Sequence, residues 1–168
     1  SLVYDDQSKA VSFIRKLSDV YRYVLEHREK EIVPLQDELA FAKSYLFLQK
    51  IRFSENISAR IHEDAPEDRY LPPMALQLLL ENAVKHNVVS KDFPLMISVE
   101  VQKDSLIVKN TIREKKVKDS TGIGLNNLKE RYRFLTDKEV EVRVEQGLFR
   151  VQIPLLTFAE STPRKART

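Results

Sequence analysis

The 168-residue sequence has no cysteine and no tryptophan, and it has only three glycines and two methionines. The absence of cysteine excludes disulfide bonds, thiolate zinc sites and thiol nucleophiles. No apolar run approaches the ~20 residues of a membrane-spanning helix, and the first residues lack the basic and then apolar pattern of a signal peptide. These absences predict a soluble, cytoplasmic chain that is stabilised by its hydrophobic core alone.

The three glycines are too few for either common phosphate-loop motif, G-x-x-x-x-G-K-[ST] or G-x-G-x-x-G. Two of them nevertheless stand together, as Gly122 and Gly124 in the T-G-I-G-L segment of residues 121–125. A chain with so little glycine is expected to place such a pair where the backbone bends tightly or approaches another group closely.

Charge of neither sign dominates, since 28 Lys and Arg residues face 25 Asp and Glu residues and give a formal net charge of +3. This balance does not favour a dedicated nucleic-acid binder. A weak nucleic-acid alternative rests on basic residues that no aromatic stacking platform accompanies. They are Lys115, Lys116, Lys118, Arg164, Lys165 and Arg167.

The hydrophobic pattern predicts helices and strands in mixed order. Helices are expected over residues 9–30, 34–51, 73–87 and 124–135. Strands are expected over residues 57–61, 95–102, 105–110, 140–145 and 148–156. Because the strands come mainly as hairpin pairs with helices between the pairs, we expect an α+β fold: a mixed or antiparallel sheet with helices on one face.

The first two expected helices form a helical arm. In the second helix, Pro34 suits the first turn, and Asp37 and Glu38 lie near its positive N-terminal end. In the first helix, apolar residues repeat at heptad spacing. They are Ala10, Ile14, Leu17, Tyr21 and Val24.

The arm is expected to span residues 1–53 and to lead into a globular body over residues 54–157. Residues 158–168 are expected to be a disordered tail. His27 lies in a charged helix end and His62 at a strand end, so both are predicted to be surface residues.

The helix expected over residues 73–87 has one apolar and one chemically varied face. The varied face carries Glu81, Asn82, Lys85 and His86 on two adjacent turns. A carboxylate, an amide, an ammonium and an imidazole in one patch can hold hydrated Mg²⁺, polarise a hydroxyl and meet phosphate charge. A solvated outer face with a Glu81–Lys85 pair is the alternative interpretation of this helix alone.

The glycine pair lies where a polar loop enters a helix. Unpaired N–H groups and the helix dipole attract anions there, and a phosphate could approach the backbone closely at Gly122 and Gly124. A plain helix N-terminus capped by Ser120 or Thr121 is the alternative.

In combination, E-N-A-x-K-H on a helix, a strand hairpin, a polar lid and G-I-G-L-x-N opening a helix resemble the ATP-binding domain of histidine kinases. The order resembles more widely the GHKL fold, a two-layer α/β sandwich shared by gyrase, Hsp90, histidine kinases and MutL. The leading segment is similar to LytS/YehU-type sensor kinases, and the resemblance spans residues 5–156. The segments that carry it are residues 13–23, 35–39, 45–46, 49–53 and 71–74.

The resemblance implies ATP and Mg²⁺ as cofactors. Asn82 would be the Mg²⁺ ligand, with Glu81 beside it as the polarising or basic group, and residues 111–121 would form the nucleotide lid. Asn127 and Arg131 would be supporting residues. The remaining nucleotide-binding residues would be Lys85, His86 and Asn87 at the triphosphate or ribose, Asn110 at the base, and Gly122, Ile123, Gly124 and Leu125 at the phosphates.

The sequence departs from the family pattern at two places. Asn110 stands where the family has the Asp of an Asp-x-Gly box, and a neutral acceptor would weaken adenine binding by about 1–1.5 kcal/mol, roughly tenfold. The family's His-Phe-x-Phe-Asn acceptor motif is also missing. We therefore expect the acceptor histidine, and any sensing or membrane region, upstream in a longer bacterial protein.

The sequence thus predicts the cytoplasmic, catalytic portion of a membrane-anchored two-component sensor histidine kinase. It would pass the γ-phosphoryl group of ATP to the upstream histidine and on to a response regulator, and it would form a homodimer through the arm. Autophosphorylation of this chain alone is not expected. The alternative is a degenerate, nucleotide-free module of the same fold that signals through dimerisation.

Overall fold

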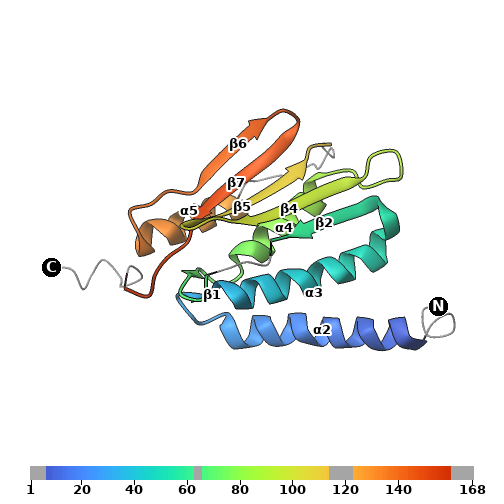
Figure 1. Cartoon of the computed structure of the whole chain (residues 1–168), viewed down its shortest axis with the longest axis horizontal. Helices are drawn as coiled ribbons and strands as arrows, with labels where there is room; N and C mark the ends of the chain where they lie inside the picture. Colours follow the sequence, from blue (N-terminus) through green and yellow to red (C-terminus); the bar gives the residue numbers. More distant parts are fainter. Residues whose placement is uncertain (1–6, 63–65, 114–122, 160–168) are drawn as a thin grey trace.

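A five-stranded mixed sheet forms the body of the protein (Figure 1). The computed structural model describes residues 7–62, 66–113 and 123–159. The sheet has the spatial order β2-β4-β5-β7-β6. Its strands are β2 (Ile57–Ile61), β4 (Leu95–Val101), β5 (Ser105–Thr111), β6 (Glu141–Glu145) and β7 (Leu148–Pro154).

The connections explain why the sheet is mixed. Strands β2 and β4 run parallel because the chain crosses from one to the other through helix α4 (Ala75–His86). The tight turns β4–β5 and β6–β7 make antiparallel hairpins, and β5 pairs antiparallel with β7 to join them. The predicted α+β class and mixed sheet are confirmed.

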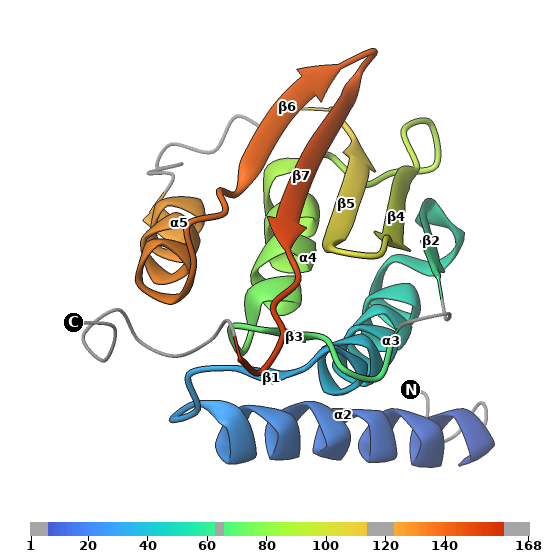
Figure 2. The same cartoon turned by 60° about the vertical axis from the view of Figure 1, so that its left-hand side comes forward.

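Helices cover one face of this sheet in two layers. Helix α3 (Leu35–Phe53), helix α4 and helix α5 (Ile123–Leu135) pack toward the sheet, whereas α2 (Gln7–His27) lies along α3 on the side away from it (Figure 2). Four residues of α3 join the core under the sheet, so this helix contacts both α2 and the body. They are Leu35, Leu39, Ala42 and Leu46.

The strand alternation positions the core. Val99 and Val108 are cross-strand neighbours whose side chains lie in the core on the helix side. On the opposite face, Lys109 Nζ lies 2.9 Å from a carboxylate oxygen of Glu100. The wholly buried Tyr132 of α5 donates its hydroxyl to the Pro154 carbonyl at 2.9 Å, which anchors α5 to the end of β7.

Two short strands, which the sequence pattern did not predict, tie the arm to the body. Strand β1 (Val33–Pro34) pairs antiparallel with β3 (Tyr70–Leu71), and Tyr70 also bridges to Leu156. Strands of two residues are too short to show an alternating pattern. Their pairing fixes where α3 begins relative to the loop that leads into α4.

The prediction that His27 lies at the surface is wrong, because only 7% of its area is exposed. Its ring stacks on Tyr23 with centroids 4.4 Å apart, and its Nε2 lies 3.3 Å from a carboxylate oxygen of Asp37. The imidazole therefore lies between the last turns of α2 and the first turn of α3. His62 is exposed, as predicted.

The structure divides the predicted heptad pattern of α2 between two surfaces. Ala10, Leu17 and Val24 are half-buried, whereas the other two members of the pattern are exposed. We define the arm stripe as the four apolar residues of α2 that are between 56% and 69% exposed and lie at spacings of three, seven and four. They are Val11, Ile14, Tyr21 and Leu25. Within the described ranges, no helix is long and apolar enough to span a membrane.

Candidate functional site

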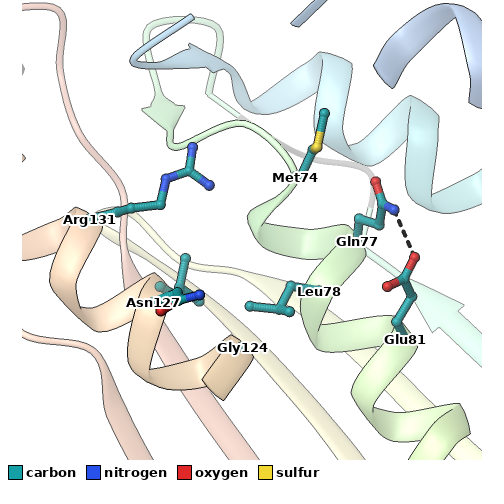
Figure 3. A pocket seen from close by; sticks show the side chains of 8 residues that line it. Met74, Gln77, Leu78, Glu81, Gly124, Asn127 and Arg131 are labelled. Carbon is teal, nitrogen blue, oxygen red and sulfur yellow. Dashed lines mark hydrogen bonds between the residues drawn. The ribbon is translucent and has the colours of Figure 1, made fainter. Parts of the chain in front are cut away.

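A cavity of about 260 Å³ lies between α4 and α5 (Figure 3). Its walls come from the first half of α4 and from one side of α5. The lining residues are Met74, Gln77, Leu78, Glu81, Gly124, Asn127, Leu128 and Arg131. The cavity therefore brings together parts of the two sequence motifs that are about forty residues apart in the chain.

The sequence of α4 sets which side chains face this cavity. Leu76, Leu79, Leu80 and Ala83 are buried in the core, which turns the opposite side of the helix outward. Glu81 is exposed and accepts a hydrogen bond of 2.7 Å from Gln77 Nε2 (Figure 3).

Asn82 follows Leu78 by four residues, so it lies one turn farther along the same row of α4. It is half-buried, and its amide makes no hydrogen bond with any residue of the described ranges. Lys85 is exposed and His86 is half-buried on the following turn. These three residues lie beyond the cavity, toward the C-terminal end of α4.

Gly124 allows α4 and α5 to approach closely. A Cβ atom at this position would lie 2.7 Å from Leu78 Cδ1, and Figure 3 shows the Leu78 side chain pointing across to α5. The structure thus supplies a packing reason for one glycine of the pair. The approach of a phosphate to this backbone stays a prediction, and Gly122 lies outside the described residues.

The start of α4 is held by a buried carboxylate from α3. Glu38 is fully buried and accepts hydrogen bonds from the N–H groups of Met74 at 2.5 Å and Leu76 at 2.7 Å. Met74 has a left-handed backbone with φ of 63°. From the other side, Arg131 Nη1 donates to the Pro73 carbonyl at 3.0 Å. The corner where the chain enters α4 is therefore fixed from both α3 and α5.

Tyr23 of α2 donates its hydroxyl to the same Glu38 carboxylate. Burial raises the pKa of Glu38 above its ordinary value, although the Tyr23 hydroxyl and the two N–H donors act in the opposite direction. Burial, together with the Glu38 charge, also raises the pKa of Tyr23, so that its hydroxyl stays protonated and remains a donor.

Asn87 fixes the C-terminal end of α4. This buried side chain donates through Nδ2 to the Ala83 carbonyl at 2.9 Å and accepts from the Arg113 N–H at 2.6 Å. The Val88 N–H also donates to the Arg113 carbonyl at 2.8 Å. Asn87 therefore has a structural role in joining α4 to the segment that follows β5, and its contact with a nucleotide stays a prediction.

Asn110 occupies the end of β5 on the helix side of the sheet, in alternation with the core residue Val108. It is buried, and its Nδ2 donates to the Thr111 carbonyl at 2.8 Å. No residue of the described ranges donates to its amide oxygen, which can accept a further hydrogen bond. A carboxylate here would lose the Thr111 bond, which gives a structural reason for asparagine at this position.

The predicted site residues fall into two groups. Glu81 and Gly124 line the cavity with Asn127 and Arg131. The other predicted residues that the structure describes are not among its lining residues. Ile123 is exposed at the start of α5, and Leu125 packs against the core. Of the predicted lid, residues 114–121 lie outside the described residues.

The sequence interpretation missed four residues of the cavity wall, one of which is Leu128, four residues after Gly124. Met74 and Leu78 precede Asn82 by eight and four residues, and Gln77 precedes Glu81 by four. Helical spacing alone could have placed them beside the predicted patch.

The donor set fits a magnesium ion that is held mainly by other ligands. The described residues contain no group of three or more His, Asp or Glu side chains that could hold a metal ion. Asn82 offers one amide oxygen next to the Glu81 carboxylate. Such a sparse oxygen set suits Mg²⁺, which usually keeps several waters and binds through one or two protein groups plus substrate phosphates.

Comparisons with known proteins bear on the family and the fold of this chain. A family model described as Histidine kinase matches residues 1–57. The Sensor protein LytS of Bacillus cereus is 30% identical over 166 residues, which cover 88% of this chain and 28% of that protein. The chain therefore spans less than a third of the length of this relative.

Two solved structures share the fold. The cytoplasmic segment of histidine kinase QseC aligns with a TM-score of 0.53 at 19% identity, over 86% of this chain and 95% of that chain. The catalytic domain of histidine kinase ThkA aligns with a TM-score of 0.50 at 18% identity, over 73% of this chain and 93% of that chain. The predicted two-layer sandwich of the histidine kinase type is confirmed.

Proposed function

The chain is a relative of the LytS-type sensor histidine kinases, and from this premise we propose that it binds ATP with Mg²⁺ at the cavity between α4 and α5. The observation that carries the proposal is the convergence of the Glu81 side of α4 and Gly124 of α5 on one cavity. The first N–H groups of a helix have no partner within the helix, and at the start of α5 they would favour a polyphosphate. Asn82 would coordinate the ion that neutralises it.

The size of the cavity suggests how a nucleotide would lie. Its volume of about 260 Å³ falls below the ~300–1,000 Å³ usual for cofactor sites. The nucleotide would therefore occupy this cavity in part and extend along α4 toward Lys85 and His86. At the sheet end of the site, the amide oxygen of Asn110 would accept the adenine amino group.

The reaction proposed for the whole protein is transfer of the γ-phosphoryl group to a histidine and then to a response regulator. Phosphoryl transfer requires mainly positioning and charge neutralisation. This portion of the protein would supply both through Glu81, Asn82 and the N–H groups at the start of α5. The acceptor histidine would lie upstream, and the portion described here would be the cytoplasmic part of a membrane-anchored sensor.

Asn82→Ala is expected to weaken Mg·ATP binding about tenfold, or about 1.4 kcal/mol, because the ion loses a direct protein ligand. Isothermal titration calorimetry measures the dissociation constant. Asn126→Ala is the matched control, since Asn126 is exposed on α5 and does not line the cavity. It should leave the dissociation constant unchanged.

Omitting Mg²⁺ should reduce wild-type affinity to about that of Asn82→Ala. If the wild-type chain shows no Mg²⁺-dependent binding up to about 1 mM ATP, the proposal fails. A dimer that remains intact in that case would favour the nucleotide-free signalling module.

We further propose that two copies associate through the arm stripe. Its four apolar side chains are exposed on the side of α2 away from α3, and exposed apolar patches mark association surfaces. A two-fold axis would bring the same residues of both copies together. Helix α2 would then pack between α3 of its own chain and α2 of the second copy.

Ile14→Glu is expected to raise the dimer dissociation constant at least about tenfold, because each copy would bury a carboxylate against an apolar surface. Sedimentation velocity over a concentration series measures it. Ser12→Glu adds the same charge two residues away at an exposed position outside the stripe, and it should leave the dimer intact. Equal effects of the two variants would contradict an interface at the stripe.

A further inference from the structure

Glu38 is a buried carboxylate that no cation in the described ranges pairs with directly. Its side chain is 0% exposed. Arg131 acts on it through charge, but the Arg131 guanidinium donates its hydrogen bond to the Pro73 carbonyl. Glu38 bonds instead to the Tyr23 hydroxyl and to two backbone N–H groups. Burying a carboxylate without a direct cationic partner costs desolvation free energy. The part of the structure that its hydrogen bonds hold in place therefore indicates its role.

That part of the structure is the entrance to α4. Pro72 and Pro73 have no N–H, so the Met74 N–H is the first backbone donor of this corner, and it points to Glu38. Glu38 thereby stabilises a left-handed non-glycine residue that would otherwise be unfavourable. Met74 forms this corner, and Arg131 holds it through the Pro73 carbonyl. Both residues line the cavity (Figure 3).

The third partner of Glu38 comes from α2, the outermost helix. The Tyr23 ring stacks on His27 and contacts Phe41 with centroids 5.0 Å apart, so packing between α2 and α3 sets its position. Its hydroxyl then reaches Glu38. A continuous set of hydrogen bonds therefore runs from α2 through one carboxylate to the first turn of the helix that carries Asn82.

We propose that Glu38 is a positioning residue of the nucleotide site, and that the Tyr23 hydroxyl couples its position to the packing of α2 against α3. This inference rests on the proposed nucleotide binding at the cavity. A shift of α2 that withdraws the hydroxyl changes the Glu38 carboxylate, then the Met74 corner, and then the width of the cavity. Because such coupling is reciprocal, a bound nucleotide strengthens the Tyr23–Glu38 contact.

Tyr23→Phe tests the coupling, since it removes the hydroxyl and keeps the ring packing. We expect the folded variant to bind Mg·ATP about fivefold more weakly. We also expect faster amide hydrogen exchange at Met74 and Leu76, with no change at Ala83 in the second half of α4. Ser12→Ala removes a hydroxyl from the same helix at an exposed position outside the arm stripe, and it should change neither measurement.

If Glu38 had a merely structural role, the effects of the two substitutions on the Mg·ATP dissociation constant would not depend on each other. In a Glu38→Gln background, Tyr23→Phe should therefore alter the Mg·ATP dissociation constant much less than in wild type. The proposal is overturned if Tyr23→Phe leaves the dissociation constant unchanged, whether or not the exchange rates rise. If wild type binds no Mg·ATP, the proposed function fails; hydrogen exchange then still decides whether Tyr23 and Glu38 hold the start of α4.

Discussion

Glu38→Ala is expected to lower the free energy of unfolding by about 3–5 kcal/mol. The substitution leaves the N–H groups of Met74 and Leu76 and the Tyr23 hydroxyl without their acceptor. Each unsatisfied buried donor costs about 1–3 kcal/mol, and the lost side chain also leaves a cavity between α3 and α4. Urea denaturation followed by far-UV circular dichroism measures the change.

Glu26→Ala is the matched control, because Glu26 is an exposed glutamate of the arm. Its effect should stay within about 0.5 kcal/mol. If Glu38→Ala also costs less than about 1 kcal/mol, water or a rearranged side chain must satisfy the three donors. The described hydrogen bonds would then not explain how α4 is held.

The role of Glu38 could not be predicted from local sequence. Asp37 and Glu38 both fit the first turn of α3, where a negative charge favours the helix dipole. In the structure Asp37 contacts His27, whereas Glu38 bonds to the first turn of α4. Local patterns describe one helix at a time, and a carboxylate that joins three helices becomes apparent only when their packing is known.

His27 was mispredicted for a related reason. Charged neighbours in a sequence indicate a solvated segment only if the chain does not fold back over them. Here the β1–β3 pairing holds the start of α3 against the end of α2, and the ring of Tyr23 supplies a surface for the imidazole. The pairing consists of two residues on each side, which is below the length that periodicity can reveal.

The larger elements were predictable because their signals are long or repeated. Helices α2 to α5 and the two hairpins lie within a few residues of the predicted ranges. The motif around Asn82 also predicted that α4 carries one wall of the candidate site, and the glycine pair predicted a second wall at the start of α5. The motifs could not identify Met74 and Leu78 as part of the α4 wall, because both resemble ordinary core residues in sequence.

Gly124 illustrates how one residue can satisfy two requirements that the sequence does not separate. A glycine at the start of a helix suits close approach of an anion, and the same glycine lets α5 pack against Leu78. Only the packing requirement is observed in the structure, and the approach of an anion stays a prediction. The packing requirement can be tested separately by substituting Leu78, the packing partner of Gly124.

Gly124→Val is expected to lower the free energy of unfolding by about 3 kcal/mol, because the Cβ would lie 2.7 Å from Leu78 Cδ1 and its two methyl groups need further space. Gly124→Ala should cost less, since the end of the Leu78 side chain can move into the adjacent cavity. That movement would also weaken Mg·ATP binding in both variants. Urea denaturation and calorimetry measure the two effects.

Leu78→Ala should partly restore stability in the Gly124→Val background, so the double-mutant cycle should give a favourable coupling of about 1–2 kcal/mol. Leu135→Ala is the matched control, because Leu135 is a half-buried leucine at the far end of α5, and its effect should add to that of Gly124→Val within about 0.5 kcal/mol. Recovery of stability without recovery of Mg·ATP binding would show that residue 124 also contacts the nucleotide. Additive behaviour of Gly124→Val and Leu78→Ala would instead mean that the close approach of α4 and α5 does not require glycine.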